Sequence, residues 1–320
     1  MDKILYVIFW LLSLLPLRLL YGLSDILYFL IYYVARYRRK IVSKNLSNSF
    51  PEKKKRELRK IEKKFYQYFC DTFIETVKLL SISDKEMSKR FTFDNIEILD
   101  EYYEKGKNII LYLGHYGNWE WLTFARRASK LKHKNEQECI SVYHKLENKT
   151  FDKFYLRLRK KSNSILVPQE GLLRKLISFN KTGKLGMYCF IADQGTLWKN
   201  IYFWMDFLNQ ETAPIVGPEK IAKQTGFPVL YIDVQRRSRG YYHAHFVVMT
   251  ENPKELPDFE LTKQYMRFME QTIKREPAYW LWTHNRWKRK KSQMSGVNID
   301  RYEKISNKEF SLVDSSSRHN

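Results

Sequence analysis

One hydrophobic segment, residues 108–113, constrains the fold of this chain more than any other feature of its sequence. The segment reads Asn-Ile-Ile-Leu-Tyr-Leu and predicts a buried β-strand. It runs directly into residues 114–120, Gly-His-Tyr-Gly-Asn-Trp-Glu, and residues 119 to about 130 predict a helix. A strand, a short polar loop and a helix in this order are typical of α/β folds, in which ligands bind at the carboxyl ends of the strands.

The loop holds a candidate general base, His115, with a carboxylate at Glu120. A histidine beside a carboxylate is a common arrangement for proton transfer. On one continuous helix the two side chains would point about 140° apart. They can meet if His115 lies in the loop and Glu120 in the first helical turn, and the glycines of the motif permit such a loop. The alternative is a surface histidine and a glutamate that complements the helix dipole.

Strands and helices alternate through the rest of the body. Further strands are predicted at 139–143, 185–192, 227–234 and 241–248, and helices at 51–80, 150–161, 171–179, 217–225 and 261–275. This alternation predicts an α/β fold with a mixed, mainly parallel sheet flanked by helices. We expect three regions: a membrane anchor at 1–36, the main domain at 37–291 and a polar C-terminal tail at 292–320.

The N-terminus is strongly apolar, because residues 4–35 contain only two charged residues, Arg18 and Asp25. Residues 4–23 reach the roughly 20 mostly apolar residues that a membrane span needs, provided that Arg18 snorkels to the interface. We favour an uncleaved membrane-anchoring helix. A secretory signal peptide and a buried helix of a soluble protein are the alternatives, although the apolar region is long for a signal peptide and lacks a cleavage site.

Positive charge dominates the chain, with 57 Lys and Arg against 35 Asp and Glu and a net charge of +22. Residues 36–64 carry 13 Lys and Arg against three Glu. A basic flank next to an anchor is expected on the cytoplasmic side, against an anionic membrane surface. The three cysteines are far apart and form no CxxC pair, so they predict neither a disulfide framework nor a zinc site, and no metal is expected.

Two other segments hold candidate binding residues. Asp193, Gln194 and Gly195 directly follow a predicted strand, so they are expected either to share a cleft with His115 or to form an ordinary turn. Residues 157–161 include Arg157, Arg159, Lys160 and Lys161. This cluster suits a phosphate or carboxylate ligand or a solvated helix face.

The C-terminal segment 280–290 combines three Trp with a basic run. Aromatic rings interleaved with basic side chains suit nucleic acid or the headgroup region of a membrane. The segment therefore leaves open a second class of function, a membrane-tethered nucleic-acid-binding protein.

In order along the chain, five segments resemble the late acyltransferases of lipid A biosynthesis. These enzymes belong to the wider glycerol-phosphate-acyltransferase-like group, whose mark is His-x4-Asp/Glu. The matching segments are Asn45-Leu46 with 50–52 (Phe-Pro-Glu), the 114–120 motif, Arg159, Asp193-Gln194, and 282–288 (Trp-Thr-His-Asn-Arg-Trp-Lys). The resemblance covers roughly residues 1–290. It departs from the family pattern at Ala192, where Pro is usual, and at Asn285, where Arg is usual.

The resemblance implies a glycerol-3-phosphate-acyltransferase-like fold and a reaction at the cytoplasmic face of the inner membrane. A fatty acyl chain would pass from acyl carrier protein to a hydroxyl of a phosphorylated lipid A precursor. His115 would act as general base and Glu120 would fix its tautomer. Arg159 would bind an acceptor phosphate or stabilise the oxyanion, and Asp193 would orient that arginine or a sugar hydroxyl.

The rest of the expected substrate-binding set is Asn118, Gln194, His284 and Arg286. The resemblance implies no cofactor, and no nucleic-acid partner is expected. An acyltransferase that acts on another glycolipid or an aminolipid remains an alternative, as does a catalytically inert scaffold on the membrane surface.

Overall fold

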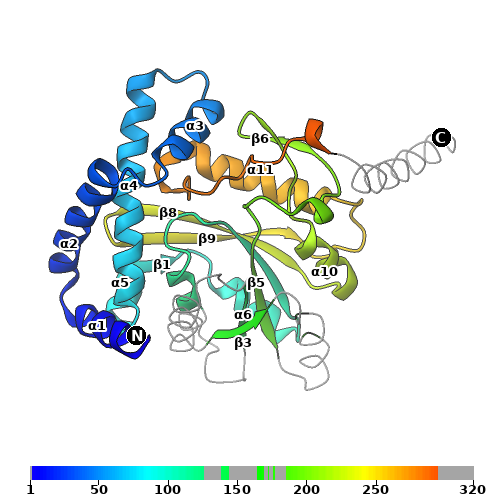
Figure 1. Cartoon of the computed structure of the whole chain (residues 1–320). Helices are drawn as coiled ribbons and strands as arrows, with labels where there is room; N and C mark the ends of the chain where they lie inside the picture. Colours follow the sequence, from blue (N-terminus) through cyan, green and yellow to red (C-terminus); the bar gives the residue numbers. More distant parts are fainter. Residues whose placement is uncertain are drawn as a thin grey trace, which may run out of the picture.

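The computed structural model describes residues 2–125, 138–143, 164–168, 172, 176 and 185–294. Its centre is a seven-stranded sheet in the order β1-β9-β8-β2-β5-β3-β4 (Figure 1). Within it, β8 and β9 pair antiparallel and the other neighbouring pairs are parallel. The strands are β1 (Phe91–Phe93), β2 (Ile109–Leu113), β3 (Glu138–Tyr143), β4 (Ser164–Pro168), β5 (Gly186–Ile191), β8 (Val229–Ser238) and β9 (Tyr241–Thr250), with β6 (Met205–Phe207) and β7 (Gln210–Thr212) as a separate antiparallel pair.

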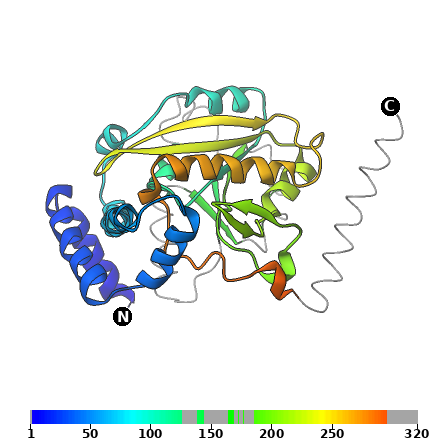
Figure 2. The ribbon, with the colours of Figure 1, turned by 90° about the horizontal axis from the view of Figure 1, so that it is seen from above.

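Helices cover both faces of this sheet. Figure 2 shows α11 on one face of β8 and β9, and α6 on the other. The α-helices are α1 (Asp2–Leu14), α2 (Leu17–Phe29), α3 (Arg39–Ser49), α4 (Lys55–Lys78), α5 (Asp84–Arg90), α6 (Glu97–Glu104), α10 (Gly217–Thr225) and α11 (Glu260–Arg275), with a π-helix η1 (Leu30–Val34) and short 3-10 helices η2 (Trp121–Phe124), η5 (Trp198–Asn200), η6 (Pro277–Tyr279) and η7 (Lys291–Gln293). The predicted mixed, mainly parallel α/β fold is confirmed.

The core of the sheet follows from the apolar runs of the sequence. All five residues of β2 are buried, as expected for a central strand that is covered on both faces. α10 ends where predicted, because Gly226 adopts φ +73° and accepts the left-handed conformation that stops a helix. α4 begins at Lys55, four residues later than predicted, and the Glu57 side chain accepts a hydrogen bond from the Lys54 backbone N–H (2.9 Å).

Several elements differ from the sequence prediction. The expected helix at 119–130 begins as a turn and the short 3-10 helix η2, and residues 126–137 lie outside the described residues. The helices predicted at 150–161 and 171–179 also fall outside them, apart from residues 172 and 176. The unpredicted α5, α6, β1, β4, β6 and β7 have eight residues or fewer, which is too short for a periodic pattern to be recognised. The 11-residue helix α3 was not predicted either.

The apolar N-terminus forms two helices rather than the single one predicted. α1 and α2 are separated at Pro16, because proline lacks the N–H that would continue the helix. By length and composition, residues 17–34 would suffice to cross a membrane. One side of α2 packs against α4 and buries Leu17, Leu20 and Ser24. In the described part of the chain, all the exposed large hydrophobic side chains except Leu197, Tyr241 and Val248 lie between residues 4 and 37.

Candidate active site

Two loops leave the sheet side by side at the carboxyl ends of the adjacent parallel strands β2 and β5. Leu113 is the register partner of Ile191, so His115 and Asp193, each two residues further on, emerge next to each other. The polar residues at the two strand ends are therefore brought together, as the sequence predicted. A carboxyl edge of this kind is the usual ligand site in α/β folds.

His115 is held by Asp193 through both its ring and its backbone. The Nδ1 atom lies 2.7 Å from Asp193 Oδ1, and the backbone N–H donates to Oδ2 (3.0 Å). Trp280 Nε1 also donates to Oδ2 (2.7 Å). Burial alone would raise the pKa of Asp193, but His115, through its charge and hydrogen bonds, and the Trp280 N–H lower it to about 2.

The ionised carboxylate determines the tautomer of the histidine. A carboxylate only accepts hydrogen bonds, so Nδ1 carries the hydrogen when the imidazole is neutral. Nε2 is then the basic nitrogen, and it lies 3.4 Å from Gln194 Nε2. The His115 side chain is 20% exposed, which leaves it accessible from the cleft. This geometry is the one that a general base requires.

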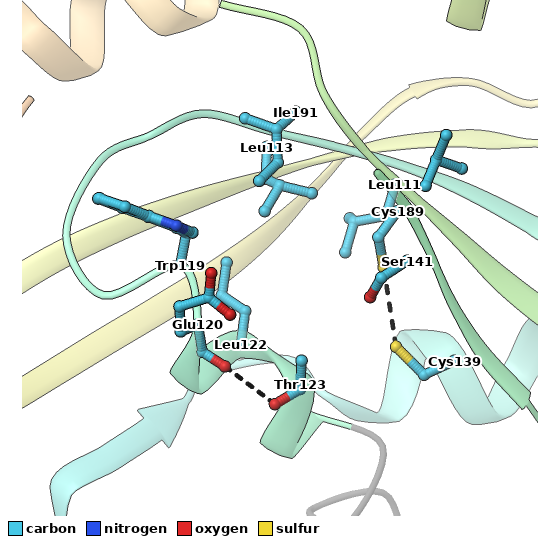
Figure 3. Close-up of a pocket in the computed structure, with 11 residues that line it drawn as sticks. Leu111, Leu113, Trp119, Glu120, Leu122, Thr123, Cys139, Ser141, Cys189 and Ile191 are labelled. Atoms are coloured by element: carbon cyan, nitrogen blue, oxygen red, sulfur yellow. Dashed lines mark hydrogen bonds between the residues drawn. The ribbon is translucent and has the colours of Figure 1, made fainter. Parts of the chain in front are cut away.

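Glu120 lies on the other side of this loop. The sequence suggested Glu120 as the partner of the imidazole, but the carboxylate at Nδ1 belongs to Asp193. Glu120 is 5% exposed and lines an apolar pocket beside the loop (Figure 3). The difference arises because Asp193 is 78 residues away along the chain, and only the pairing of β2 with β5 brings it to His115.

The pocket is enclosed by β2, β3, β5 and η2. The Trp119 ring forms one wall and meets the His115 ring edge to face, with centroids 5.3 Å apart. At the opposite side the Sγ atoms of Cys139 and Cys189 lie 3.9 Å apart. The lining residues are Leu111, Leu113, Trp119, Glu120, Leu122, Thr123, Cys139, Ser141, Val142, Cys189 and Ile191. A mostly apolar space next to a candidate base suits a substrate with a hydrocarbon part.

The histidine loop has little freedom to move. Gly117 adopts φ +60°, and a Cβ there would lie 2.7 Å from Val234 Cγ1. The Gly117 N–H donates to the Tyr279 carbonyl (3.0 Å), and the Leu281 N–H donates to the His115 carbonyl (3.1 Å). The loop is therefore held against the C-terminal segment 279–282, with a glycine where no other residue fits.

Arg286 packs beneath the Asp193 loop. Its Nε donates to the Asp193 carbonyl (2.7 Å), Nη1 contacts Thr212 Oγ1, and the guanidinium is 4% exposed. Burial lowers the pKa of Arg286 to about 10, although Asp193 opposes that shift. Within the described residues Nη2 has no hydrogen-bond partner. Arg286 thus supports the loop through its Nε atom.

His284 occupies the same segment. Burial lowers its pKa to about 4, so the ring is neutral at pH 7. Its Nδ1 is buried and has no partner in the described part of the chain. Asn45 Nδ2 donates to the carbonyls of Trp282 and His284 (both 3.0 Å), which holds the Asn45 segment against the 282–288 segment.

Other predicted site residues have different surroundings. Asn118 is fully buried. Its Nδ2 donates to Glu75 Oε2 (2.7 Å) and its Oδ1 accepts from the Trp121 N–H (3.1 Å), which favours a structural role over the expected contact with substrate. Arg159 lies outside the described residues.

The aromatic rings of segment 280–290 are mainly part of the core. Trp280 is 3% exposed and Trp282 is 0% exposed, and the two rings pack edge to face with centroids 4.7 Å apart. Bases stack on exposed rings in nucleic-acid-binding proteins. The placement of these rings therefore gives no support to a nucleic-acid-binding surface in this segment.

Sequence reasoning missed Glu75, and it singled out Trp280 only as part of the aromatic and basic segment 280–290. Glu75 and Asp71 are spaced four residues apart on the buried side of α4. Their spacing of one helical turn was the only available signal, because buried carboxylates are uncommon unless they are paired.

Comparison with known proteins gives one consistent result. A family model described as bacterial lipid A biosynthesis acyltransferase matches residues 2–289. The chain is 24% identical over 282 residues to the lipid A biosynthesis lauroyltransferase of Escherichia coli K12, a match that spans 88% of this chain and 89% of that protein. It is 23% identical over 213 residues to the lipid A biosynthesis acyltransferase of Haemophilus influenzae, spanning 67% of this chain and 64% of that protein.

Proposed function

Because the chain belongs to the family of bacterial lipid A biosynthesis acyltransferases, we propose that it transfers a fatty acyl chain from acyl carrier protein to a hydroxyl of a lipid A precursor. The observation that carries this proposal is the His115–Asp193 pair, with Nδ1 2.7 Å from the carboxylate, beside an apolar pocket. The pair supplies a base, and the pocket supplies a place for a hydrocarbon chain.

In the proposed reaction, Nε2 of His115 removes the proton from the acceptor hydroxyl as its oxygen attacks the thioester carbonyl. The new C–O bond forms, the C–S bond breaks, and the proton passes from the imidazolium to the leaving thiolate. Asp193 stabilises the imidazolium through Nδ1. Gln194, 3.4 Å from Nε2, is placed to contact the acceptor or the developing oxyanion.

The donor chain is proposed to lie in the pocket between Trp119 and the Cys139–Cys189 pair. Its thioester would then lie near His115, because Trp119 contacts both the pocket and the imidazole. Glu120 is part of the same lining, and we assign it to the catalytic machinery on the donor side. Arg159 is proposed to face the phosphorylated acceptor, because guanidinium groups bind phosphate well. Arg286 is buried beneath the Asp193 loop, so we propose that it supports the acceptor site from behind, together with His284 of the same segment.

We place the protein at the cytoplasmic face of the inner membrane, bound through α1 and α2. The exposed apolar side chains gather on these helices, and the exposed basic residues Arg36, Lys40 and Lys44 follow them. The inner side of α2 is tied to the main domain, where Ser24 donates to Asp71 (2.7 Å). Helices lying along the membrane surface fit this arrangement better than a span, because a span would bring buried charged groups of α4 towards the bilayer.

The net charge of +22 supports both proposed partners. Acyl carrier protein is acidic and the acceptor carries phosphate, so a basic protein attracts each of them, and salt weakens the attraction. An acceptor other than a lipid A precursor would have to share this negative charge.

The test is acyl transfer in washed membranes from cells that express the wild type, His115→Ala or His245→Ala. Acyl carrier protein thioester and a lipid A precursor are supplied, and products are identified by mass. We expect His115→Ala to lose at least about 10²-fold in rate. His245, whose side chain is 49% exposed on β9, is the matched control and should keep wild-type activity. Equal rates in all three would remove His115 from the mechanism, and no transfer by the wild type would refute the proposed acceptor or donor.

A further inference from the structure

Glu75 is a buried carboxylate that joins three separate parts of the protein. The side chain lies on α4 and is 0% exposed. Tyr21 of α2 donates to Oε1 (2.9 Å), while Asn118 of the histidine loop and Tyr242 of β9 both donate to Oε2 (2.7 Å each). A single carboxylate thus contacts the N-terminal helices, the catalytic loop and the central sheet.

The stability of the fold does not by itself require a carboxylate at this position. Burial raises the pKa of Glu75, while Arg236 and the hydroxyl of Tyr242 lower it. Arg236 in turn pairs with Asp71 (2.7 Å), one turn earlier on α4. Desolvating such groups costs several kcal/mol per ion, and apolar side chains of similar size would fill the same space without that cost.

α4 fixes the catalytic loop at three consecutive places. The Tyr68 hydroxyl donates to the Gly117 carbonyl (2.6 Å), the Glu75 carboxylate accepts from Asn118, and the Glu75 carbonyl accepts from Trp121 Nε1 (3.0 Å). Asn118 is three residues after His115. The contacts of α4 therefore define the path of the loop that presents the imidazole.

α4 also holds α2, the helix with the exposed apolar side. Besides the Tyr21–Glu75 contact, Ser24 donates to Asp71 (2.7 Å). Arg239 bridges Asp71 (2.7 Å) and Asp25 (2.6 Å). Any shift of α2 relative to α4 would disturb the donor set of Glu75, and with it the anchor of Asn118.

We propose that Glu75 is a positioning residue, which sets the geometry of the His115 loop and makes that geometry depend on how α2 is seated. The proposal rests on the proposed function, because it requires His115 to act on the substrate. It adds a route by which docking of the N-terminal helices on a lipid surface affects catalysis.

The first arm of the test exchanges the two partners. Asn118→Asp places a second carboxylate against Glu75 at the 2.7 Å contact, and we expect kcat to fall about 10²-fold because the loop is displaced. Adding Glu75→Gln restores a donor–acceptor pair, because the new amide can donate to the new carboxylate at position 118. We expect kcat of the double variant to be at least about tenfold higher than that of Asn118→Asp, which is a clear departure from additivity.

The readout separates positioning from loss of folded protein. A displaced imidazole changes the pKa that controls kcat/KM, whereas a smaller folded fraction lowers the whole pH profile without shifting it. We expect a shifted profile for Asn118→Asp and a wild-type profile for the double variant. A double variant no more active than Asn118→Asp, or an unshifted profile, would overturn the positioning role.

The second arm tests the link to α2. Tyr21→Phe removes only the hydroxyl that contacts Glu75. The control, Tyr28→Phe, removes a hydroxyl from the same helix, from a ring that packs on Tyr32 with centroids 5.6 Å apart. On anionic vesicles we expect Tyr21→Phe to lower kcat several-fold while the protein still co-sediments with the vesicles as the wild type does. Tyr28→Phe should match the wild type in both measurements. Equal kcat for Tyr21→Phe and the wild type would overturn the link. The proposed function is tested separately: it stands if the wild type transfers acyl chains and His115→Ala does not, whatever the results of these two arms.

Discussion

Replacing Asp193 with asparagine changes one polar atom at the contact that defines the proposed base. The amide oxygen of the new side chain can still accept from the His115 backbone N–H and from Trp280, both of which now bind Oδ2. The amide nitrogen then takes the place of Oδ1 and donates to Nδ1. The hydrogen of the neutral imidazole moves to Nε2, so the nitrogen that faces the acceptor is no longer basic.

The size of the effect follows from the electrostatics of this pair. His115 and Trp280 hold the pKa of Asp193 at about 2 against an ordinary value of 3.8, in spite of burial. Asparagine carries no charge and so cannot stabilise the imidazolium, and it also selects the wrong tautomer. In a serine protease triad the same substitution costs about 10⁴-fold in kcat. We therefore expect Asp193→Asn to lose about 10²- to 10⁴-fold in kcat.

The assay compares Asp193→Asn with Glu120→Gln in the acyl-transfer reaction, measuring kcat and KM for the donor over a range of pH. The structure puts Asp193 at Nδ1 and Glu120 in the pocket wall. Asp193→Asn should therefore show the larger fall in kcat, by at least about tenfold. If Glu120→Gln lost more activity, or if Asp193→Asn stayed within tenfold of the wild type, the assignment of Asp193 as the partner of His115 would be refuted.

Three further predictions concern stability, pH and chain length. Gly117→Ala should lower the free energy of unfolding by about 1–3 kcal/mol, seen as a lower Tm, because φ is +60° and Val234 leaves no room for a Cβ; an unchanged Tm would contradict the geometry. The pKa of His284 is lowered to about 4 by burial, so the unfolded chain binds more protons than the folded chain below pH 6.5. The free energy of unfolding should therefore fall by about 3 kcal/mol between pH 6.5 and pH 4. Chemical denaturation of His284→Gln should show a free energy of unfolding that depends less on pH over this range. Cys189→Leu narrows the pocket. If the last two methylenes of a long acyl chain no longer fit, their lost burial costs about 1.6 kcal/mol, so kcat/KM for long-chain donors should fall about 15-fold relative to short-chain donors. Cys189→Ala should not change this preference for chain length. If Cys189→Leu and Cys189→Ala changed the preference equally, the acyl chain would have to bind elsewhere.

The sequence predicted the elements that repeat over several turns or strand residues, and it predicted which loops would carry the site. β2, β5, β8, β9, α10 and α11 were all expected from apolar periodicity and from glycine at a helix end. The adjacency of His115 and Asp193 followed from the rule on carboxyl ends of strands. The family resemblance, carried by the ordered segments, agrees with the family model over residues 2–289.

The pairing inside the site could not be predicted in this way. Which carboxylate meets the imidazole depends on β2 lying next to β5, and strand order is a tertiary property. The burial of Asn118 depends in the same way on α4, whose Glu75 is 43 residues away along the chain. Pro16 could have predicted the break between α1 and α2. It was overlooked because one proline barely changes the mean hydropathy of residues 4–23. Local patterns report the environment of a residue and not its distant partners.

Asn45 has a consequence for the order in which the protein is made. It holds carbonyls that are 237 and 239 residues away along the chain, and Trp280, which binds Asp193, belongs to the same late segment. Contacts with a C-terminal segment can form only after that segment has been synthesised, because the chain is made from the N-terminus onward. α1 and α2 therefore leave the ribosome before the histidine has its completed surroundings. If these helices bind lipid as proposed, the nascent chain attaches to the membrane before the histidine site is complete.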